Sequence, residues 1–359
     1  MEKETVLVGL SGGVDSAATA VLLQEQGYRV IGATMLIWDP SLPVPKGEHQ
    51  KNACLAPEKE DLSEVEAIAK KLGIEFLTVD CREEYKHAVL DNFRLEYACG
   101  RTPNPCVLCN SLIKFGVLPS AAVRQGVHFD KFATGHYARV EKDEKTGKYL
   151  LKKAVDLSRD QSYFLHRLTQ QQLSHVLFPL GDKTKPQIRR KARQAGLKVA
   201  DKEDSMDFYC GDYNDLLNFP NKPGDMVTLD GKTVARHTGI WNYTIGKRKG
   251  LGISGFAEPM YVVKIDAEKN QVIIGPKSAL YSSTLRAGNV SWMAGEPPAK
   301  EFDCEVKIRN LHIPAQAHIT VQEDGSFAAV FVQPQLSVTA GQSAVLYQDD
   351  VVLGGGIIL

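Results

Sequence analysis

The stretch Leu10-Ser11-Gly12-Gly13-Val14-Asp15-Ser16 joins an apolar run, Thr5 to Gly9, to a helical run that ends at Gly27. The pattern predicts a buried strand, a glycine-rich turn and a helix. Such a turn suits phosphate, because glycine lets the backbone approach an anion that the first N–H groups of the helix face. The serine hydroxyls would add donors, and Asp15 could orient a metal ion. The plainer alternative is a tight turn that binds nothing.

This motif differs from two common nucleotide-binding motifs. It has neither the lysine nor the spacing of a Walker A loop, and it does not match the GxGxxG pattern of dinucleotide folds. It resembles the PP-loop of the N-type ATP pyrophosphatases, SGGxDS, at every fixed position. That resemblance implies cleavage of ATP between its α- and β-phosphates and adenylation of an oxygen on an acceptor, and it leaves the acceptor open.

Bulk properties limit the class of protein. The chain has 359 residues, which favours two or three domains, and a formal net charge of +0, so a nucleic-acid partner would have to be held by local patches. Its seven cysteines form no even set of the kind found in a secreted disulfide framework. No apolar run approaches the ~20 residues of a membrane span, and no targeting segment is evident at the N-terminus. We therefore expect a cytoplasmic protein with no membrane partner.

The first ~135 residues alternate between strand and helix patterns, which predicts an α/β domain with a largely parallel sheet. Ligands of such sheets bind at the carboxyl ends of the strands, so Ser11–Ser16, Met35 and Gly135-His136 should share one edge. The predicted strands cover residues 5–9, 29–38, 74–80 and 129–134, and the predicted helices cover 17–24, 62–72, 85–97 and 112–125, the last broken near Pro119.

Residues further along predict one more helix and, after it, two smaller β-rich units. Thr184 and Gln187 form a capping box at the start of a helix, whose basic run, Lys183 to Arg193, would contact RNA phosphates. From about Asp225 the apolar residues alternate, which predicts a central β-rich domain and a closing C-terminal β-barrel. We place the domain boundaries at 1–205, 206–278 and 279–359.

Two segments carry informative cysteines. In Gly100 to Asn110, two prolines predict an extended loop and place Cys109 at the start of a helix, where the helix dipole would lower its thiol pKa. Cys106 and Cys109 form one CxxC pair, which is weak evidence for zinc or for a redox disulfide. Cys210, between Tyr209 and Gly211, could be a simple core residue.

Together these segments resemble one family, the tRNA-specific 2-thiouridylases, over nearly the whole chain. The motifs that carry the resemblance are Gly9 to Ser16, Gly100 to Pro105, Leu108 to Asn110, Ala133 to Tyr137, Asp160 to Phe164, Lys247 to Gly252 and Gly341-Gln342.

The resemblance implies a reaction and a set of residues. ATP, with Mg²⁺ near Asp15, would adenylate O2 of the wobble uridine of tRNA. Cys210 would carry a persulfide from a sulfur-relay protein or cysteine desulfurase, and Cys109 would act as the nucleophile, ending in a Cys109–Cys210 disulfide or passing through hydrosulfide. Implied ATP contacts are Gly9, Leu10, Ser11, Gly12, Gly13, Val14, Asp15, Ser16, Met35 and Gly135; implied contacts to the target base are Asn104, Pro105 and Cys106; implied tRNA contacts are His136, Arg159, Asp160, Gln161, Arg309, Asn310 and Gln342.

The sequence departs from the family pattern at two places. Cys106 stands where the family usually has an acidic residue, and the residues around Cys210 differ from the usual DSTGICFIG. Two alternative functions stay open: another PP-loop synthetase with a different acceptor, and an RNA-binding protein with a relic ATP site. The cysteine pair argues against the first, and the intact Ser11–Ser16 motif argues against the second.

Overall fold

A five-stranded parallel sheet forms the centre of the first domain. The computed structural model describes residues 3–44, 53–57, 61–204, 207–209 and 211–359. The strand order is β4-β2-β1-β5-β8, and every neighbouring pair is parallel, as predicted. The bounds are Thr5–Gly9 (β1), Arg29–Leu36 (β2), Glu75–Asp80 (β4), Lys131–Ala133 (β5) and Val176–Leu177 (β8).

Helices cover both faces of this sheet, which explains the nearly continuous apolar character of its strands. Alternate residues of β1 point to opposite faces: Val6 and Val8 pack with residues of α1 and α2, and Leu7 packs with the helices of the other face. Helix α8 packs along α1 through Ala192 and Ala17. The bounds are Val14–Glu25 (α1), Ser63–Leu72 (α2) and Lys185–Gln194 (α8).

Two long helices contain π-helical segments. One comprises α3 (Arg82–Tyr85), η3 (Lys86–Leu90) and α4 (Asp91–Ala98), and the other comprises α5 (Pro105–Leu108), η4 (Cys109–Val117) and α6 (Leu118–Arg124). The predicted break near Pro119 is wrong. The backbone N–H of Leu118 still donates to the carbonyl oxygen of Ile113, which is the π-helical pattern. Pro119 lies where the hydrogen bonding changes from the π to the α pattern. The helix stays continuous there because the N–H that proline lacks is not needed at the changeover.

The helix Pro105–Arg124 is, among the described residues, the one helix long and apolar enough to cross a membrane. Its apolar side chains Ile113, Phe115 and Leu118 belong to the core of the first domain. Packing inside the protein therefore accounts for its composition.

The C-terminal domain forms the predicted β-barrel. Six strands run in the order β14-β17-β16-β15-β18-β19, and β14 pairs with β19 to close it, with Ala287 opposite Ile358. Hairpin β6–β7 of the first domain extends this sheet, because Lys152 pairs with Val351. The bounds are Ala138–Lys142 (β6), Tyr149–Lys153 (β7), Tyr281–Trp292 (β14), Glu301–Lys307 (β15), Ala315–Val321 (β16), Phe327–Leu336 (β17), Ser343–Gln348 (β18) and Val351–Ile358 (β19).

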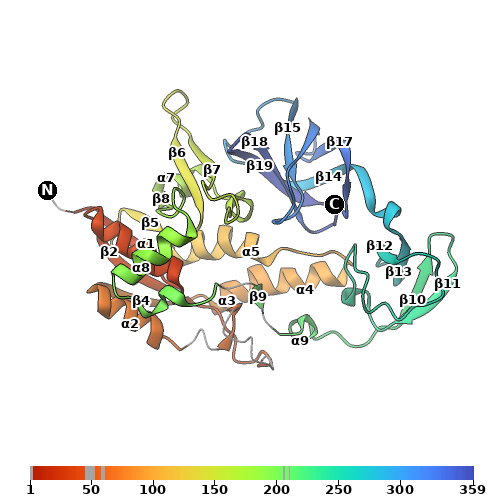
Figure 1. Ribbon diagram of the computed structural model, residues 1–359, viewed down its shortest axis with the longest axis horizontal. Coiled ribbons are helices and arrows are strands. Elements are labelled where there is room, and N and C mark those ends of the chain that lie inside the picture. Colours follow the sequence, from red (N-terminus) through yellow and green to blue (C-terminus); the bar gives the residue numbers. More distant parts are fainter. Residues whose placement is uncertain (1–2, 45–52, 58–60, 205–206, 210) are drawn as a thin grey trace.

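The central domain is the predicted small β-rich unit. Its four-stranded sheet has the order β11-β10-β13-β12, and in Figure 1 it lies at the end of the molecule farthest from the N-terminus. Its bounds are Gly224–Thr228 (β10), Thr233–His237 (β11), Met260–Asp266 (β12) and Gln271–Pro276 (β13). The remaining elements are Ala53–Leu55 (β3), Ser162–Leu165 (η5), Gln170–His175 (α7), Lys198–Asp201 (η6), Asp207–Tyr209 (β9), Tyr213–Leu217 (α9), Ile240–Asn242 (η7) and Lys277–Leu280 (η8).

Candidate active site

The glycine-rich turn lies at the carboxyl edge of the parallel sheet, between β1 and α1. Gly12 has a φ of +72°, a conformation that glycine adopts without strain. Gly13 is the N-cap of α1 and has no side chain to cap the helix. Within the turn, the backbone N–H of Ser11 donates to Ser16 Oγ at 3.1 Å. The helix therefore begins with an end that no capping side chain covers, which is the arrangement that phosphate needs.

Gly135 brings the end of β5 against this turn. A Cβ atom on Gly135 would lie 2.8 Å from both the carbonyl carbon of Asp15 and the backbone nitrogen of Ser16, so only glycine fits. Met35 lies two residues past Ala33, the register partner of Gly9, and thus at the same edge. The structure brings these predicted ATP contacts together, as the strand order requires.

Asp15 is held by groups from two other segments. Lys185 Nζ lies 2.8 and 2.7 Å from its two carboxylate oxygens, and the Tyr137 hydroxyl donates to Oδ1 at 2.9 Å. The Asp15 carboxylate raises the pKa of Tyr137, in addition to the larger effect of burial. Lys185 also contacts Asp204 at 2.6 Å.

Sequence reasoning missed Lys185 as a site residue. It placed Lys185 in a basic run facing RNA, but its side chain is only 7% exposed and lies within the protein. Arg189 of the same run donates to the carbonyl oxygens of Ala200 and Lys202. One signal was available: a lysine in the first turn of a helix opposes the helix dipole and is expected to have an acidic partner.

Cys109 does not lie where the sequence analysis placed it. The helix begins four residues earlier, with Asn104 as N-cap and Pro105 in its first turn, a position that proline favours. Cys109 is half-buried, and burial raises its pKa to about 11, although the charge of Lys114 acts in the opposite direction. The predicted low thiol pKa is therefore wrong for this conformation, because desolvation of the thiolate exceeds any effect of the helix dipole.

Three cysteines interact electrostatically around this helix. Burial is the largest cause of the raised pKa of both Cys106 and Cys109, and Cys54, which is exposed on β3, raises both pKa values further. β3 pairs with β9, the strand Asp207–Tyr209, so the chain just before Cys210 is fixed to the first domain. Cys210 itself lies outside the described residues. All six described cysteines are free thiols.

Burial also predicts how fast Cys109 reacts. At pH 8, a thiol with a pKa of about 11 is almost wholly protonated, whereas an ordinary thiol is about one quarter thiolate. We expect iodoacetamide to alkylate Cys109 in the native protein on the order of 100-fold more slowly than in the urea-unfolded chain, with a rate that rises as the pH approaches 11. Peptide mass spectrometry measures both rates, and equal rates would contradict the assigned pKa.

The predicted tRNA contacts near the turn differ in exposure. Arg159 is 44% exposed and pairs with Asp204 at 2.8 Å. Asp160 accepts from Ser162, and Gln161 accepts from the Tyr137 backbone, so both serve the local fold. His136 is 8% exposed, and its Nδ1 lies 2.7 Å from Thr134 Oγ1. Burial lowers the pKa of His136 well below its ordinary value, so it is neutral at pH 7.

The barrel contributes the remaining predicted contacts. Gln342 Nε2 donates to the carbonyl oxygens of Thr102 and Pro103 at 2.8 and 3.2 Å, and the Thr102 N–H donates to Ala340. The loop that precedes Asn104 is thus attached to the barrel. Arg309 and Asn310 follow β15 and are half-buried.

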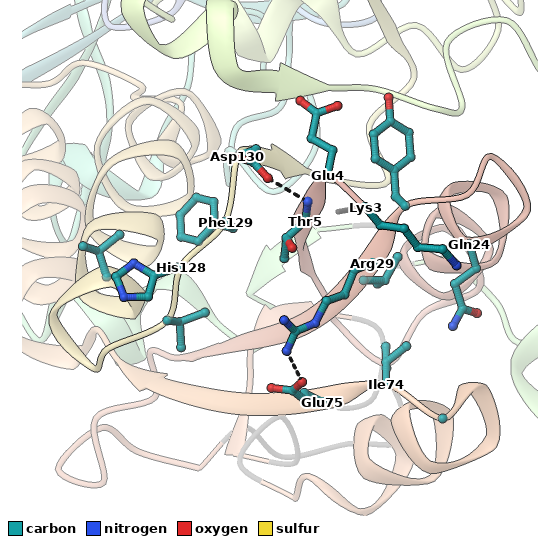
Figure 2. A pocket seen from close by; sticks show the side chains of 15 residues that line it. Lys3, Glu4, Thr5, Gln24, Arg29, Ile74, Glu75, His128, Phe129 and Asp130 are labelled. Atoms are coloured by element: carbon teal, nitrogen blue, oxygen red, sulfur yellow. Dashed lines mark hydrogen bonds and ion pairs between the residues drawn. The ribbon is translucent and has the colours of Figure 1, made fainter. Parts of the chain in front are cut away.

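A cavity of about 1060 Å³ lies elsewhere, at the amino ends of the strands (Figure 2). It contains the Arg29–Glu75 ion pair and the hydrogen bond from the Thr5 backbone to Asp130. Its lining carries charges of both signs, of which Arg29 and Glu75 are paired with each other. The expected ligand edge is the opposite one, at the carboxyl ends.

The residues at the turn fit ATP but form no complete metal site. The bare N-cap at Gly13 and the close approach of Gly135 provide a backbone cradle for phosphate. Among the described residues, no group of three or more histidine, cysteine or acidic side chains could hold a metal. Both carboxylate oxygens of Asp15, the residue predicted to lie near Mg²⁺, contact Lys185 in this structure.

Comparisons with known proteins cover almost the whole chain. Three family models match: a "tRNA methyl transferase HUP domain" over residues 4–210, a "tRNA methyl transferase PRC-barrel domain" over 217–276 and an "Aminomethyltransferase beta-barrel domain" over 282–358. A curated tRNA-specific 2-thiouridylase MnmA from Endomicrobium trichonymphae is 55% identical, with 100% of each chain covered. Relatives of the same name from Acetivibrio thermocellus and Paraburkholderia phytofirmans are 42% and 44% identical, with 100% of this chain and 100% and 94% of theirs covered.

Proposed function

The chain belongs to the tRNA-specific 2-thiouridylase family, and on that basis we propose that it uses ATP to replace O2 of the wobble uridine of tRNA with sulfur. The observation that carries this proposal is the 55% identity to a relative of that name over the full length of both chains. The family models are described as methyl transferase domains, but a PP-loop with a cysteine-bearing helix supports adenylation followed by sulfur transfer.

In the proposed first step, residues Gly9 to Ser16, with Met35 and Gly135, bind ATP. The N-terminus of α1 faces the phosphates, and pyrophosphate leaves when O2 of the uridine attacks the α-phosphate. This step converts O2 into part of an AMP leaving group. Mg²⁺, when bound with the nucleotide, would neutralise charge on the phosphates. Asn104, Pro105 and Cys106 would contact the base from the N-terminus of α5.

In the proposed second step, sulfur reaches the activated carbon. A persulfide on Cys210 attacks C2, AMP leaves, and the Cys109 thiolate attacks the inner sulfur of Cys210 to release the thiolated base as a Cys109–Cys210 disulfide forms; release of hydrosulfide is the alternative. Cys109 must lose a proton first, since burial holds its thiol protonated at pH 7. Lys114 carries the charge that favours this loss.

The substrate and partners follow from the same proposal. The substrate is tRNA, with His136, Arg159 to Gln161, Arg309, Asn310 and Gln342 as proposed contacts. The sulfur donor is a sulfur-relay protein or a cysteine desulfurase, and the enzyme acts in the cytoplasm. Cys106 replaces an acidic residue of the family, and because burial holds its thiol neutral it cannot supply the charge of that carboxylate.

The test of the proposed function is tRNA-dependent release of pyrophosphate. We expect wild-type protein with ATP-Mg to release it at least about tenfold faster with a tRNA that has uridine at the wobble position than with the same tRNA carrying cytidine there. Release that is independent of tRNA, or equal for the two bases, would overturn the proposal in favour of another acceptor.

A further inference from the structure

Lys185 forms a buried junction between the turn and a distant acidic residue. Its ammonium has three N–H donors, and three carboxylate oxygens lie within 2.8 Å: both oxygens of Asp15, and Oδ1 of Asp204. All three donors are therefore in use. The side chain of Lys185 is 7% exposed and its three donors are all used, so it belongs to the protein interior and is not a surface charge available to bind RNA.

The two carboxylates depend on Lys185 to different degrees. Asp204 also pairs with Arg159 at 2.8 Å and with Arg189 at 3.5 Å, so it stays compensated without the lysine. In the described part of the chain, the carboxylate of Asp15 contacts Lys185 and the neutral hydroxyl of Tyr137. Removing the lysine would thus leave an uncompensated negative charge at Asp15 alone.

Asp15 lies in the first turn of α1, in the loop proposed to bind the triphosphate. A bare carboxylate there would repel the phosphate oxygens, and that repulsion is strong where water is partly excluded. We propose that Lys185 is a positioning residue of the nucleotide site. It neutralises and orients Asp15 so that a nucleoside triphosphate can bind beside that carboxylate. The inference rests on the proposed function, because it takes the turn to be the ATP site.

Binding of a non-hydrolysable ATP analogue with Mg²⁺, measured by calorimetry, tests this role without requiring catalysis. We expect Lys185→Met to weaken binding of the analogue about tenfold or more. Lys185→Arg, which keeps the positive charge, should retain most of the wild-type affinity. Asp204→Asn should stay within about threefold of wild type, because Asp15 keeps its lysine. If Asp204→Asn lost as much affinity for the analogue as Lys185→Met does, the proposal would be overturned, because Lys185 would then only hold the two segments together.

Lys191→Met is the matched control. Lys191 lies on the same helix and also bridges α8 to α1, through Glu25 at 3.0 Å, but far from the turn. It should bind the analogue as wild type does. If Lys185→Met also binds as wild type does, the proposal is wrong. If wild-type protein itself fails to bind the analogue, the ATP assignment fails instead, so the two failures are distinguishable.

A double-mutant cycle separates positioning of Asp15 from direct contact with phosphate. Without the Asp15 charge, Lys185 has nothing there to neutralise, so Asp15→Asn and the Asp15→Asn/Lys185→Met double variant should bind the analogue equally. A further tenfold loss in the double variant would show that Lys185 contacts the nucleotide itself and would overturn the proposal. This comparison also serves if Lys185→Met alone fails to fold, because the double variant leaves no unpaired charge at Asp15.

Discussion

Replacing Gly135 by alanine should lower kcat/KM for ATP in tRNA-dependent pyrophosphate release by at least about 100-fold, or about 2.7 kcal/mol of transition-state stabilisation. The added Cβ would lie 2.8 Å from the backbone of Asp15 and Ser16, closer than such atoms approach one another. No flexible side chain can yield there, so the turn or the end of β5 must move. Steady-state kinetics at varied ATP concentration measures the effect.

Gly116→Ala is the matched control, because it makes the same change in the same domain. A Cβ on Gly116 would meet its nearest neighbour, the carbonyl oxygen of Ser111, at an ordinary 3.5 Å. We expect it to keep wild-type kinetics. Thermal melting of both variants separates a displaced turn from general unfolding. Wild-type kcat/KM in folded Gly135→Ala would show that ATP does not bind against this turn.

Changing Cys210 to serine should abolish thiolation while tRNA-dependent pyrophosphate release continues at close to the wild-type rate. In the proposed mechanism the persulfide on Cys210 enters only after adenylation, so the first half-reaction needs no sulfur at that position. A serine hydroxyl cannot carry a persulfide. Parallel assays of pyrophosphate and of thiolated tRNA on one preparation measure the two steps separately.

Cys99→Ser supplies the control for this variant, since Cys99 is an exposed free thiol to which no role is assigned. It should thiolate tRNA as wild type does. Persistent thiolation by Cys210→Ser would remove Cys210 from the mechanism. Loss of both half-reactions in a variant that melts as wild type does would show that Cys210 acts earlier than proposed.

Local sequence patterns predicted most of the architecture. The apolar runs at Thr5 to Gly9 and at residues 29–38 became parallel neighbours, and the alternation after Asp225 became the central sheet and the closed barrel. Such patterns reflect which residues are buried and which backbone conformation they prefer, and a short stretch of sequence contains both kinds of information. The placement of Gly9, Met35 and Gly135 at one edge was predicted from the general rule that ligands of parallel sheets bind at the carboxyl ends of the strands.

What the sequence did not reveal depends on contacts between distant segments. Lys185 meets Asp15 across 170 positions, and Gln342 meets Thr102 across 240, distances over which no local pattern carries information. Cys109 was misjudged for a related reason. Its place in the helix depended on where Pro105 begins the first turn, and its pKa depended on packing that raised it to about 11.

Mass spectrometry of the wobble nucleoside tests the central claim most directly. Wild-type protein is incubated with tRNA, ATP-Mg and a cysteine desulfurase with cysteine, which supplies persulfide sulfur, and the tRNA is then digested to nucleosides. We predict 2-thiouridine from the wobble position when ATP is present and none when ATP is omitted. Unmodified uridine at that position despite release of pyrophosphate, or sulfur at another position, would contradict the proposal that the PP-loop activates O2 of the wobble uridine for sulfur transfer.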